Sequence, residues 1–261
     1  MFIQYLLKAF TEAWSQIWDI PAPRFKVEDE KLDTAVLNRV TMFVFPLLGL
    51  LTGAVLMALG GILASIPGRR VEILLFSLLA AVFTEVLSGG RGLSYLSGFL
   101  ELLTQRNGVR RSLLEAPSDI NSERGPAGLA FMFIALLLRT ACFGIILSSG
   151  GTYWLMVVFA LSYTLQLQLG TIESLTTGKP FVKGESATIM VVWTFSAILI
   201  LCMGGSVIAA LVALAISGAA AFGAHKLFEH YFKGISAAAI SGIAYTLEII
   251  LLLIGAGVLE Q

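Results

Sequence analysis

Long apolar stretches, separated by short polar or glycine-containing segments, repeat along almost the whole chain. A bilayer core of roughly 30 Å requires a helix of about 20 apolar residues to cross it. Seven stretches approach or exceed that length: 41–66, 71–88, 129–148, 151–170, 187–203, 205–223 and 235–257. The pattern therefore predicts an all-α, polytopic integral membrane bundle of about seven transmembrane helices.

The N-terminal segment has a different, amphipathic pattern. Mostly aromatic apolar residues recur every three or four positions and so share one helix face: Phe2, Leu6, Phe10, Trp14 and Ile17. This stripe predicts an interfacial helix that lies flat on the membrane with its aromatic rings at headgroup depth, and Pro21 and Pro23 end it. We expect residues 1–40 to form this helix and a linker, and residues 41–261 to form the bundle.

Composition agrees with a membrane protein. Of the 261 residues, 57% are hydrophobic and 13% are charged, whereas typical soluble domains carry about 25% charged residues. Seventeen basic residues balance seventeen acidic ones, so the net charge gives no reason to expect a nucleic-acid partner. Cys142 and Cys202 both lie within apolar stretches, which favours two packed thiols over a metal site or a disulfide.

The basic residues indicate the orientation in the membrane. With seven spans, fourteen of the seventeen fall on one side, in residues 1–40, 89–128, 171–186 and 224–234. The other side receives only Arg69 and Arg70. Because cytoplasmic loops carry the excess of lysine and arginine, we expect the N-terminus in the cytoplasm and the C-terminus outside.

The cytoplasmic loop at 89–128 is the longest polar segment, and loops of such length are usually functional. Glycines and arginines in and beside it are candidate phosphate-binding residues: Gly89, Gly90, Arg91, Arg106, Arg110, Arg111, Arg124, Gly125 and Gly128. Glycines allow close backbone approach, and arginine pairs well with phosphate. The same arginines can instead hold the loop against anionic lipid headgroups, and both interpretations stay open.

Charged residues inside the apolar stretches are the most informative ones. Arg139 and Glu248 fall near the middle of their spans, where a charge costs ~3 kcal/mol or more unless it is paired or hydrated. We expect both to face the bundle interior, as an ion pair or as ligands of a substrate or a metal. Glu85 lies about one turn from its helix end. Gln166 and Gln168, beside Tyr163 and Thr164, predict a partly hydrated rim.

Several segments resemble the cobalamin-5′-phosphate synthases, also called adenosylcobinamide-GDP ribazoletransferases. These are the opening segments 20–23 (IPAP), 37–39 (LNR) and 45–53 (FPLLGLLTG), the Gly89–Gly90 pair, the G-x-x-G at 125–128, Arg139, and the last helix from Gly234 to Glu248. The resemblance covers nearly the whole chain. It implies a multi-pass enzyme of the bacterial cytoplasmic (inner) membrane that joins an activated cobinamide to a ribazole phosphate with a divalent metal such as Mg²⁺.

The chain departs from the acidic motifs of that family. In the family's H-x-D-G-x-x-D-x-x-D segment, the histidine and the first two aspartates become Gly92, Ser94 and Gly98, and only Glu101 keeps a carboxylate. The family's D-S becomes Asn121-Ser122, its T-G-D becomes residues 236–238 (SAA), and the first glutamate of its last motif becomes Tyr245. The resemblance then implies a reduced site, with Glu101, Asn121 and Ser122 as catalytic residues and Glu85, Glu101 and Glu248 as metal ligands.

Three functions remain open on these residues. The first is a transferase of phosphorus-containing groups. The second is a catalytically silent relative that binds an amphiphilic phosphate- or nucleotide-bearing ligand, or that assembles with a membrane-protein partner or a second copy of itself. The third is a transporter, which ranks last because the sequence shows no convincing internal repeat. Phosphoryl transfer depends on a metal, so the loss of acids beside retained arginines favours binding.

Overall fold

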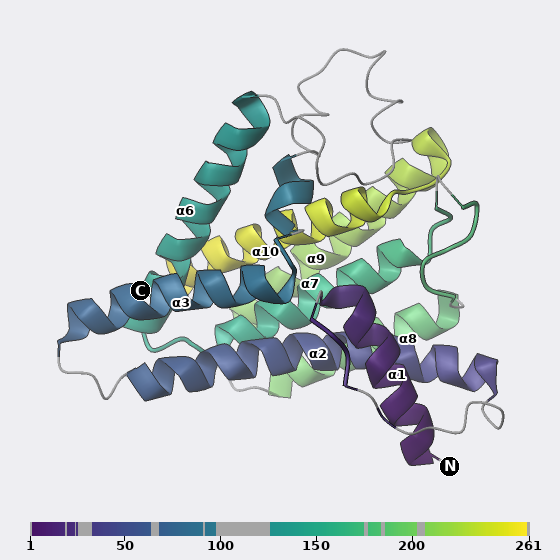
Figure 1. The fold of residues 1–261 in the computed structure, drawn as a ribbon, viewed down its shortest axis with the longest axis horizontal. Helices are drawn as coiled ribbons and strands as arrows, with labels where there is room; N and C mark the ends of the chain where they lie inside the picture. Colours follow the sequence, from purple (N-terminus) through teal and green to yellow (C-terminus); the bar gives the residue numbers. More distant parts are fainter. Residues whose placement is uncertain are drawn as a thin grey trace.

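The structure, a computed structural model, describes residues 2–18, 20–23, 25, 33–63, 68–90, 92–97, 126–174, 177–183, 186–202 and 207–259. The regular elements in these ranges are helices (Figure 1): α1 (Phe2–Ile17), α2 (Thr34–Leu63), α3 (Arg69–Leu87), α6 (Pro126–Ser148), α7 (Trp154–Gly170), α8 (Ser186–Cys202), α9 (Val207–Leu227), the π-helix η2 (Phe228–Phe232) and α10 (Ala237–Leu259). Residues 92–97 form a further short helical segment. The predicted all-α class is confirmed for this part of the chain.

Each of the seven predicted apolar stretches falls on one of these helices. Within the described ranges, four segments are long and apolar enough to cross a membrane: Thr34–Leu63, Gly128–Ser148, Val207–His230 and Ala239–Val258. The apolar helices α7 and α8 are shorter, with 17 residues each. These helices fit a multi-pass membrane protein, while the count of about seven spans, the orientation and the division at residue 40 stay predictions.

Helix α7 lies at the centre of the bundle, in contact with α2, α8, α9 and α10. Buried polar side chains tie it to its neighbours. The Trp154 indole donates to the Leu251 carbonyl of α10 at 2.8 Å, and the Ser162 hydroxyl donates to the Ala244 carbonyl at 3.1 Å. In hydrocarbon such groups find no water, so hydrogen bonds between helices satisfy them.

Two glycines allow α2 to approach α7 closely. An added Cβ at Gly49 would collide with the backbone at Phe159 and Ala160, and one at Gly53 would collide with the backbone at Met156. Small residues at helix contacts are typical of membrane bundles because they let backbones come together. This contact places α7, and the polar residues it carries, against the first apolar helix.

Replacing Gly53 by alanine is expected to destabilise the bundle by about 1–3 kcal/mol, because the methyl group must push α7 away. Gly61→Ala in the same helix is the matched control, since an added Cβ there has no atom within 4 Å. The control should be neutral or slightly stabilising, because alanine is the better helix former. Thermal unfolding in detergent measures both, and equal midpoints would show that α7 has room at Gly53.

The N-terminal helix forms as predicted, as α1, and lies across α2 (Figure 1). Its most buried side chains are Tyr5, Ala9 and Ala13, whereas Leu6 from the predicted membrane stripe is 41% exposed. The Tyr5 hydroxyl accepts a hydrogen bond from the backbone N–H of Asp33 at 2.8 Å. The helix therefore packs on the protein through these residues, with Phe10, Trp14 and Ile17 of the stripe partly buried against the core. Its place at the membrane interface stays a prediction.

Candidate functional site

Four polar side chains from three helices meet inside the bundle. Arg139 of α6 donates from Nη1 to Glu85 Oε1 of α3 at 2.5 Å and to the Tyr245 hydroxyl of α10 at 2.9 Å. Its Nη2 forms an ion pair with Glu248 of α10. The Tyr245 hydroxyl in turn donates to Glu85 Oε1 at 2.8 Å. We call these four residues the Arg139 cluster.

The local sequence explains how the cluster is built. Tyr245 and Glu248 are three residues apart on α10, so they project from the same helix face. Phe143 follows Arg139 by one turn of α6, and the Arg139 guanidinium carbon lies 5.6 Å from the Phe143 ring centre and 4.7 Å from that of Tyr245. Aromatic faces attract a cation, so the two rings stabilise the guanidinium charge as well as covering it.

The predicted inward orientation of Arg139 and Glu248, and their pairing, are confirmed. The side chain of Arg139 is only 2% exposed. Glu85 joins as a second carboxylate, which its position near a helix end did not reveal. Two carboxylates and one guanidinium leave the cluster with a formal negative charge. Three of its buried atoms, Glu85 Oε2, Arg139 Nε and Glu248 Oε1, have no hydrogen-bond partner among the described residues, although Glu248 Oε1 lies in the ion pair with Arg139.

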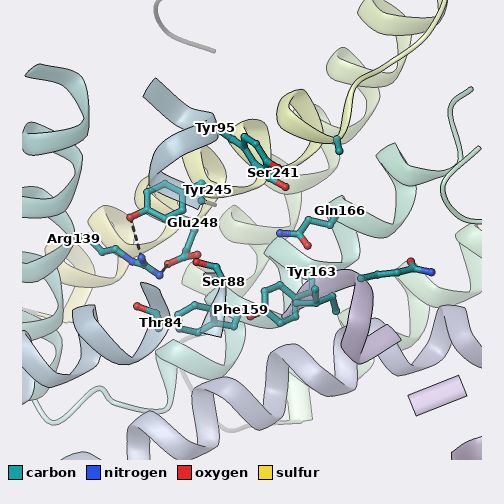
Figure 2. Close-up of a pocket in the computed structure, with 14 residues that line it drawn as sticks. Thr84, Ser88, Tyr95, Arg139, Phe159, Tyr163, Gln166, Ser241, Tyr245 and Glu248 are labelled. Atoms are coloured by element: carbon teal, nitrogen blue, oxygen red, sulfur yellow. Dashed lines mark hydrogen bonds and ion pairs between the residues drawn. The ribbon is translucent and has the colours of Figure 1, made fainter. Parts of the chain in front are cut away.

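A cavity of about 120 Å³ lies beside the cluster (Figure 2). Arg139, Tyr245 and Glu248 form one side of it, and most of its other polar groups are uncharged hydrogen-bonding side chains: Gln16, Thr84, Ser88, Tyr95, Tyr163, Gln166 and Ser241. Pockets that enclose a whole small molecule usually measure ~300–1,000 Å³. This cavity therefore suits a few waters or the polar end of a larger ligand.

Helix α1 closes one side of the cavity. Gln16 and Ile17 at its end belong to the lining, and the next residue, Trp18, donates from its indole to the Tyr163 hydroxyl at 3.1 Å. Of the residues predicted to form a partly hydrated rim, Tyr163 and Gln166 line the cavity, whereas Gln168 and Thr164 do not. The hydration of this rim stays a prediction. The contribution of α1 was not predictable from its amphipathic pattern, which shows that one face is apolar but not what covers it.

The structure places only some of the predicted site residues. Gly89 and Gly90 end α3 with positive φ values of 60° and 69°, and Gly128 is buried in the first turns of α6. The remaining predicted residues lie outside the described ranges: Arg91, Glu101, Arg106, Arg110, Arg111, Asn121, Ser122, Arg124 and Gly125. The catalytic and phosphate-binding roles assigned to them stay predictions.

The cobalamin-5-phosphate synthase family model matches residues 9–255. The chain belongs to the cobalamin-5-phosphate synthase family. No curated protein and no solved structure gave a significant match. The matched region runs from α1 into α10, so it includes the whole Arg139 cluster and the cavity. The resemblance seen in the sequence is confirmed, and membership supports a membrane role in cobalamin biosynthesis.

Gly92 and Tyr245 lie side by side in this chain. In the sequence resemblance described above, Gly92 takes the place of a family histidine and Tyr245 the place of a family glutamate. An added Cβ at Gly92 would lie 2.6 Å from Cδ2 of the Tyr245 ring. The ring therefore uses space that a side chain at position 92 would need, and the two replacements accommodate each other.

The metal implied by the cobalamin-5-phosphate synthase family does not fit the described acids as they are arranged. Glu85 and Glu248 both contact the Arg139 guanidinium, so a divalent ion between them would meet a positive charge in the same space. No group of three or more His, Cys, Asp or Glu side chains within the described ranges is placed to hold a metal ion. Glu101, the third expected ligand, lies outside those ranges.

Proposed function

We propose that this protein holds an amphiphilic, phosphate- or nucleotide-bearing ligand in the bacterial cytoplasmic membrane and does not transfer it by metal-dependent chemistry. The observation that carries the proposal is the position of Arg139, whose guanidinium pairs with Glu85 and Glu248, the carboxylates that the described residues bring to the centre of the bundle. Because arginine stays protonated in proteins, it pairs with both acids at all times, and one negative charge remains. The same acids are then not free to hold Mg²⁺ against a phosphate.

The cavity supports binding of a polar, uncharged part of such a ligand. Its lining offers amide and hydroxyl groups from Gln16, Gln166, Ser241 and others, while the adjacent cluster carries a formal negative charge. An anionic phosphate would be repelled by that negative charge, so placing it in the cavity would add little binding free energy. We therefore assign hydroxyl or amide groups of the ligand to the cavity, and its phosphate to the arginines of the loop at 89–128, on the cytoplasmic side.

Binding and turnover can be measured on the same purified protein in lipid nanodiscs. We expect saturable binding of adenosylcobinamide-GDP and no release of GMP after addition of ribazole phosphate with millimolar Mg²⁺ or Mn²⁺. Gln166→Leu should weaken binding by about tenfold, because one hydrogen bond in the cavity is lost. Gln168→Leu is the control, since the Gln168 amide accepts from the Trp193 indole at 2.6 Å and does not line the cavity.

The second candidate is a working transferase, favoured by the family match over residues 9–255. In that case Glu101, Asn121 and Ser122 would carry the reaction. Metal-dependent release of GMP would establish this function and overturn the proposal. Absence of binding would overturn the proposal too, and would favour a subunit whose role is assembly with a membrane-protein partner or with a second copy.

A further inference from the structure

The formal charges of the Arg139 cluster do not balance. Glu85 and Glu248 carry two negative charges and Arg139 carries one positive charge, so one negative charge is in excess. In the described part of the chain, Arg139 is the one basic residue that lines the cavity. An uncompensated charge inside a membrane bundle is unfavourable, so a further positive charge is expected beside the cluster.

Glu248 brings the excess charge to the cavity. Its side chain is 7% exposed and belongs to the cavity lining. Glu85 is not part of the lining, and its free oxygen Oε2 is buried, so a molecule in the cavity faces Glu248 rather than Glu85. The cavity volume of about 120 Å³ gives room for a small ion with a few waters, since one water takes about 30 Å³ in the liquid.

Two hydroxyl groups near Glu248 present oxygen lone pairs to the cavity. A hydroxyl has one hydrogen to donate and two lone pairs that accept. Thr84 Oγ1 donates to the Ala80 carbonyl at 2.8 Å, and Ser88 Oγ donates to the Glu85 carbonyl at 3.1 Å. Both residues line the cavity, but their hydrogens point to the backbone of α3. What remains for the cavity is two acceptor oxygens, which suit a positively charged group.

The hydroxyl of Tyr163 is used in the same way. Its oxygen accepts from the Trp18 indole at 3.1 Å and lies 3.5 Å from Thr52 Oγ1. Thr52 donates its own hydrogen to the Leu48 carbonyl at 2.9 Å, so Tyr163 is the donor in its contact with Thr52. Three lining hydroxyls therefore have their hydrogens bound elsewhere in the protein.

These acceptors lie at one end of the cavity. Figure 2 shows Thr84, Ser88 and Glu248 near one another, with Gln166 apart from them. We infer that this end binds one monovalent cation, an alkali-metal ion or ammonium, held by the Glu248 carboxylate and the Thr84 and Ser88 oxygens. The end at Gln166 stays available to the uncharged groups of a larger ligand.

The nearby guanidinium is compatible with such an ion. The Arg139 Nη atoms contact Glu85, Tyr245 and Glu248, so two carboxylates offset its single charge and one negative charge remains. A divalent ion would exceed that remaining charge, and Mg²⁺ also requires near-octahedral coordination. A monovalent ion matches the charge. The inference does not depend on the proposed function, because the ion is measured without the cobinamide ligand.

Stability in different salts tests the inference. Thermal midpoints are compared in neutral detergent at one pH and one ionic strength. Sodium, potassium or ammonium chloride is replaced stepwise by N-methylglucamine chloride, whose cation is too large for the cavity. We expect a small cation to raise the midpoint saturably, by about 3–6 °C at about ten times its dissociation constant, because it binds the folded protein. Equal midpoints in all four salts would overturn the inference.

Equilibrium dialysis counts the bound ions directly. Radioactive Na⁺, and Rb⁺ as the analogue of potassium and ammonium, are dialysed against the protein. We expect one bound ion per chain, and competition by unlabelled sodium, potassium and ammonium separates an alkali-metal site from an ammonium site. Absence of a saturable ion, or binding that N-methylglucamine displaces equally well, would overturn the inference.

Two serine variants locate the ion. Ser88→Ala removes one oxygen from the cavity and should weaken binding of the ion about fivefold or more. Ser77→Ala is the matched control on the same helix: Ser77 also donates to a carbonyl of α3 but does not line the cavity, so its variant should bind like the unmodified protein. Equal effects of the two substitutions would overturn the site.

A third variant tests the charge. Glu248→Gln removes the excess negative charge, so the thermal midpoint should no longer depend on the cation, and the protein should be stable in N-methylglucamine chloride alone. Saturable ion binding that persists in Glu248→Gln would overturn the inference. The two serine variants keep the test decisive if this substitution prevents folding, because they leave the charges of the cluster unchanged.

Discussion

Replacing Arg139 by leucine is expected to destabilise the folded protein by about 3–5 kcal/mol, the usual result of removing one partner from a buried ion pair. Arg139 is the only cation that contacts the Glu85 and Glu248 carboxylates among the interactions of the described residues. Without it, two negative charges remain close together inside the bundle. Unfolding in detergent, followed by thermal midpoint and by recovery of monodisperse protein, measures the loss.

Arg70→Leu is the matched control, because Arg70 lies exposed in the first turn of α3. Its effect should stay within about 0.5 kcal/mol. An Arg139→Leu protein that unfolds like the control but no longer binds ligand would contradict the structural role and would place Arg139 in the ligand site. Loss of stability with intact ligand binding would support the structural role of Arg139 as the partner of Glu85 and Glu248.

A variant that removes the whole cluster separates charge compensation from packing. Arg139→Leu combined with Glu85→Leu, Glu248→Leu and Tyr245→Phe leaves no unpaired charge or hydroxyl. Apolar replacement of a buried ionic group is often neutral or stabilising. We therefore expect this variant to recover most of the stability that Arg139→Leu loses. Failure to recover it would mean that the shape of the cluster, rather than its charges, holds the three helices together.

The helices were predictable from sequence because lipid-facing and buried residues are both apolar, so each helix appears as one long apolar stretch. The ends were less predictable. Helix α2 begins at Thr34, seven residues before the predicted span at 41–66, and includes polar Asn38 and Arg39. A helix need not end where its apolar stretch ends, because its backbone hydrogen bonds continue into the polar region. The same ambiguity affects the span count, since α7 and α8 have only 17 residues.

The centre of the site was predictable in part. The cost of a charge in hydrocarbon was enough to predict that Arg139 and Glu248 face inward and pair. Glu85 and Tyr245 were not assigned to that pair, because their contacts depend on how α3 and α10 are rotated about their axes. Tyr245 stood out in the sequence only as a missing glutamate. Its role became visible once the hydroxyl was placed between Arg139 and Glu85.

The contact between Gly92 and Tyr245 could not be predicted from the sequence at either position alone. The two residues are separated by most of the chain, and each was identified as a lost family residue. In space, the missing side chain at 92 leaves the room that the larger side chain at 245 fills. From this complementarity we predict that the two departures belong together, and variants at both positions test this prediction.

Restoring both family residues is expected to create divalent-metal binding that neither restores alone. Gly92→His by itself forces an imidazole against the Tyr245 ring and should destabilise the protein by about 1–3 kcal/mol. Tyr245→Glu by itself adds a third carboxylate near Arg139 and leaves unfilled space. The double variant has room for both side chains and places an imidazole and a carboxylate near Glu85 and Glu248. Its stability loss should be smaller than the sum of the single losses by about 0.5–3 kcal/mol.

Titration of Mn²⁺, followed by the electron paramagnetic resonance signal of the free ion, measures metal binding directly. The double variant should bind Mn²⁺ at least about tenfold more tightly than the unmodified protein or either single variant. Gly92→His with Tyr245→Phe is the control, because it keeps the ring and adds no carboxylate, so it should remain unstable and bind no more metal than the unmodified protein. Additive stability losses, or equal Mn²⁺ binding by all variants, would show that the Gly92–Tyr245 contact did not replace a metal site. Metal binding by the double variant would instead locate the lost site at this contact, beside the Arg139 cluster.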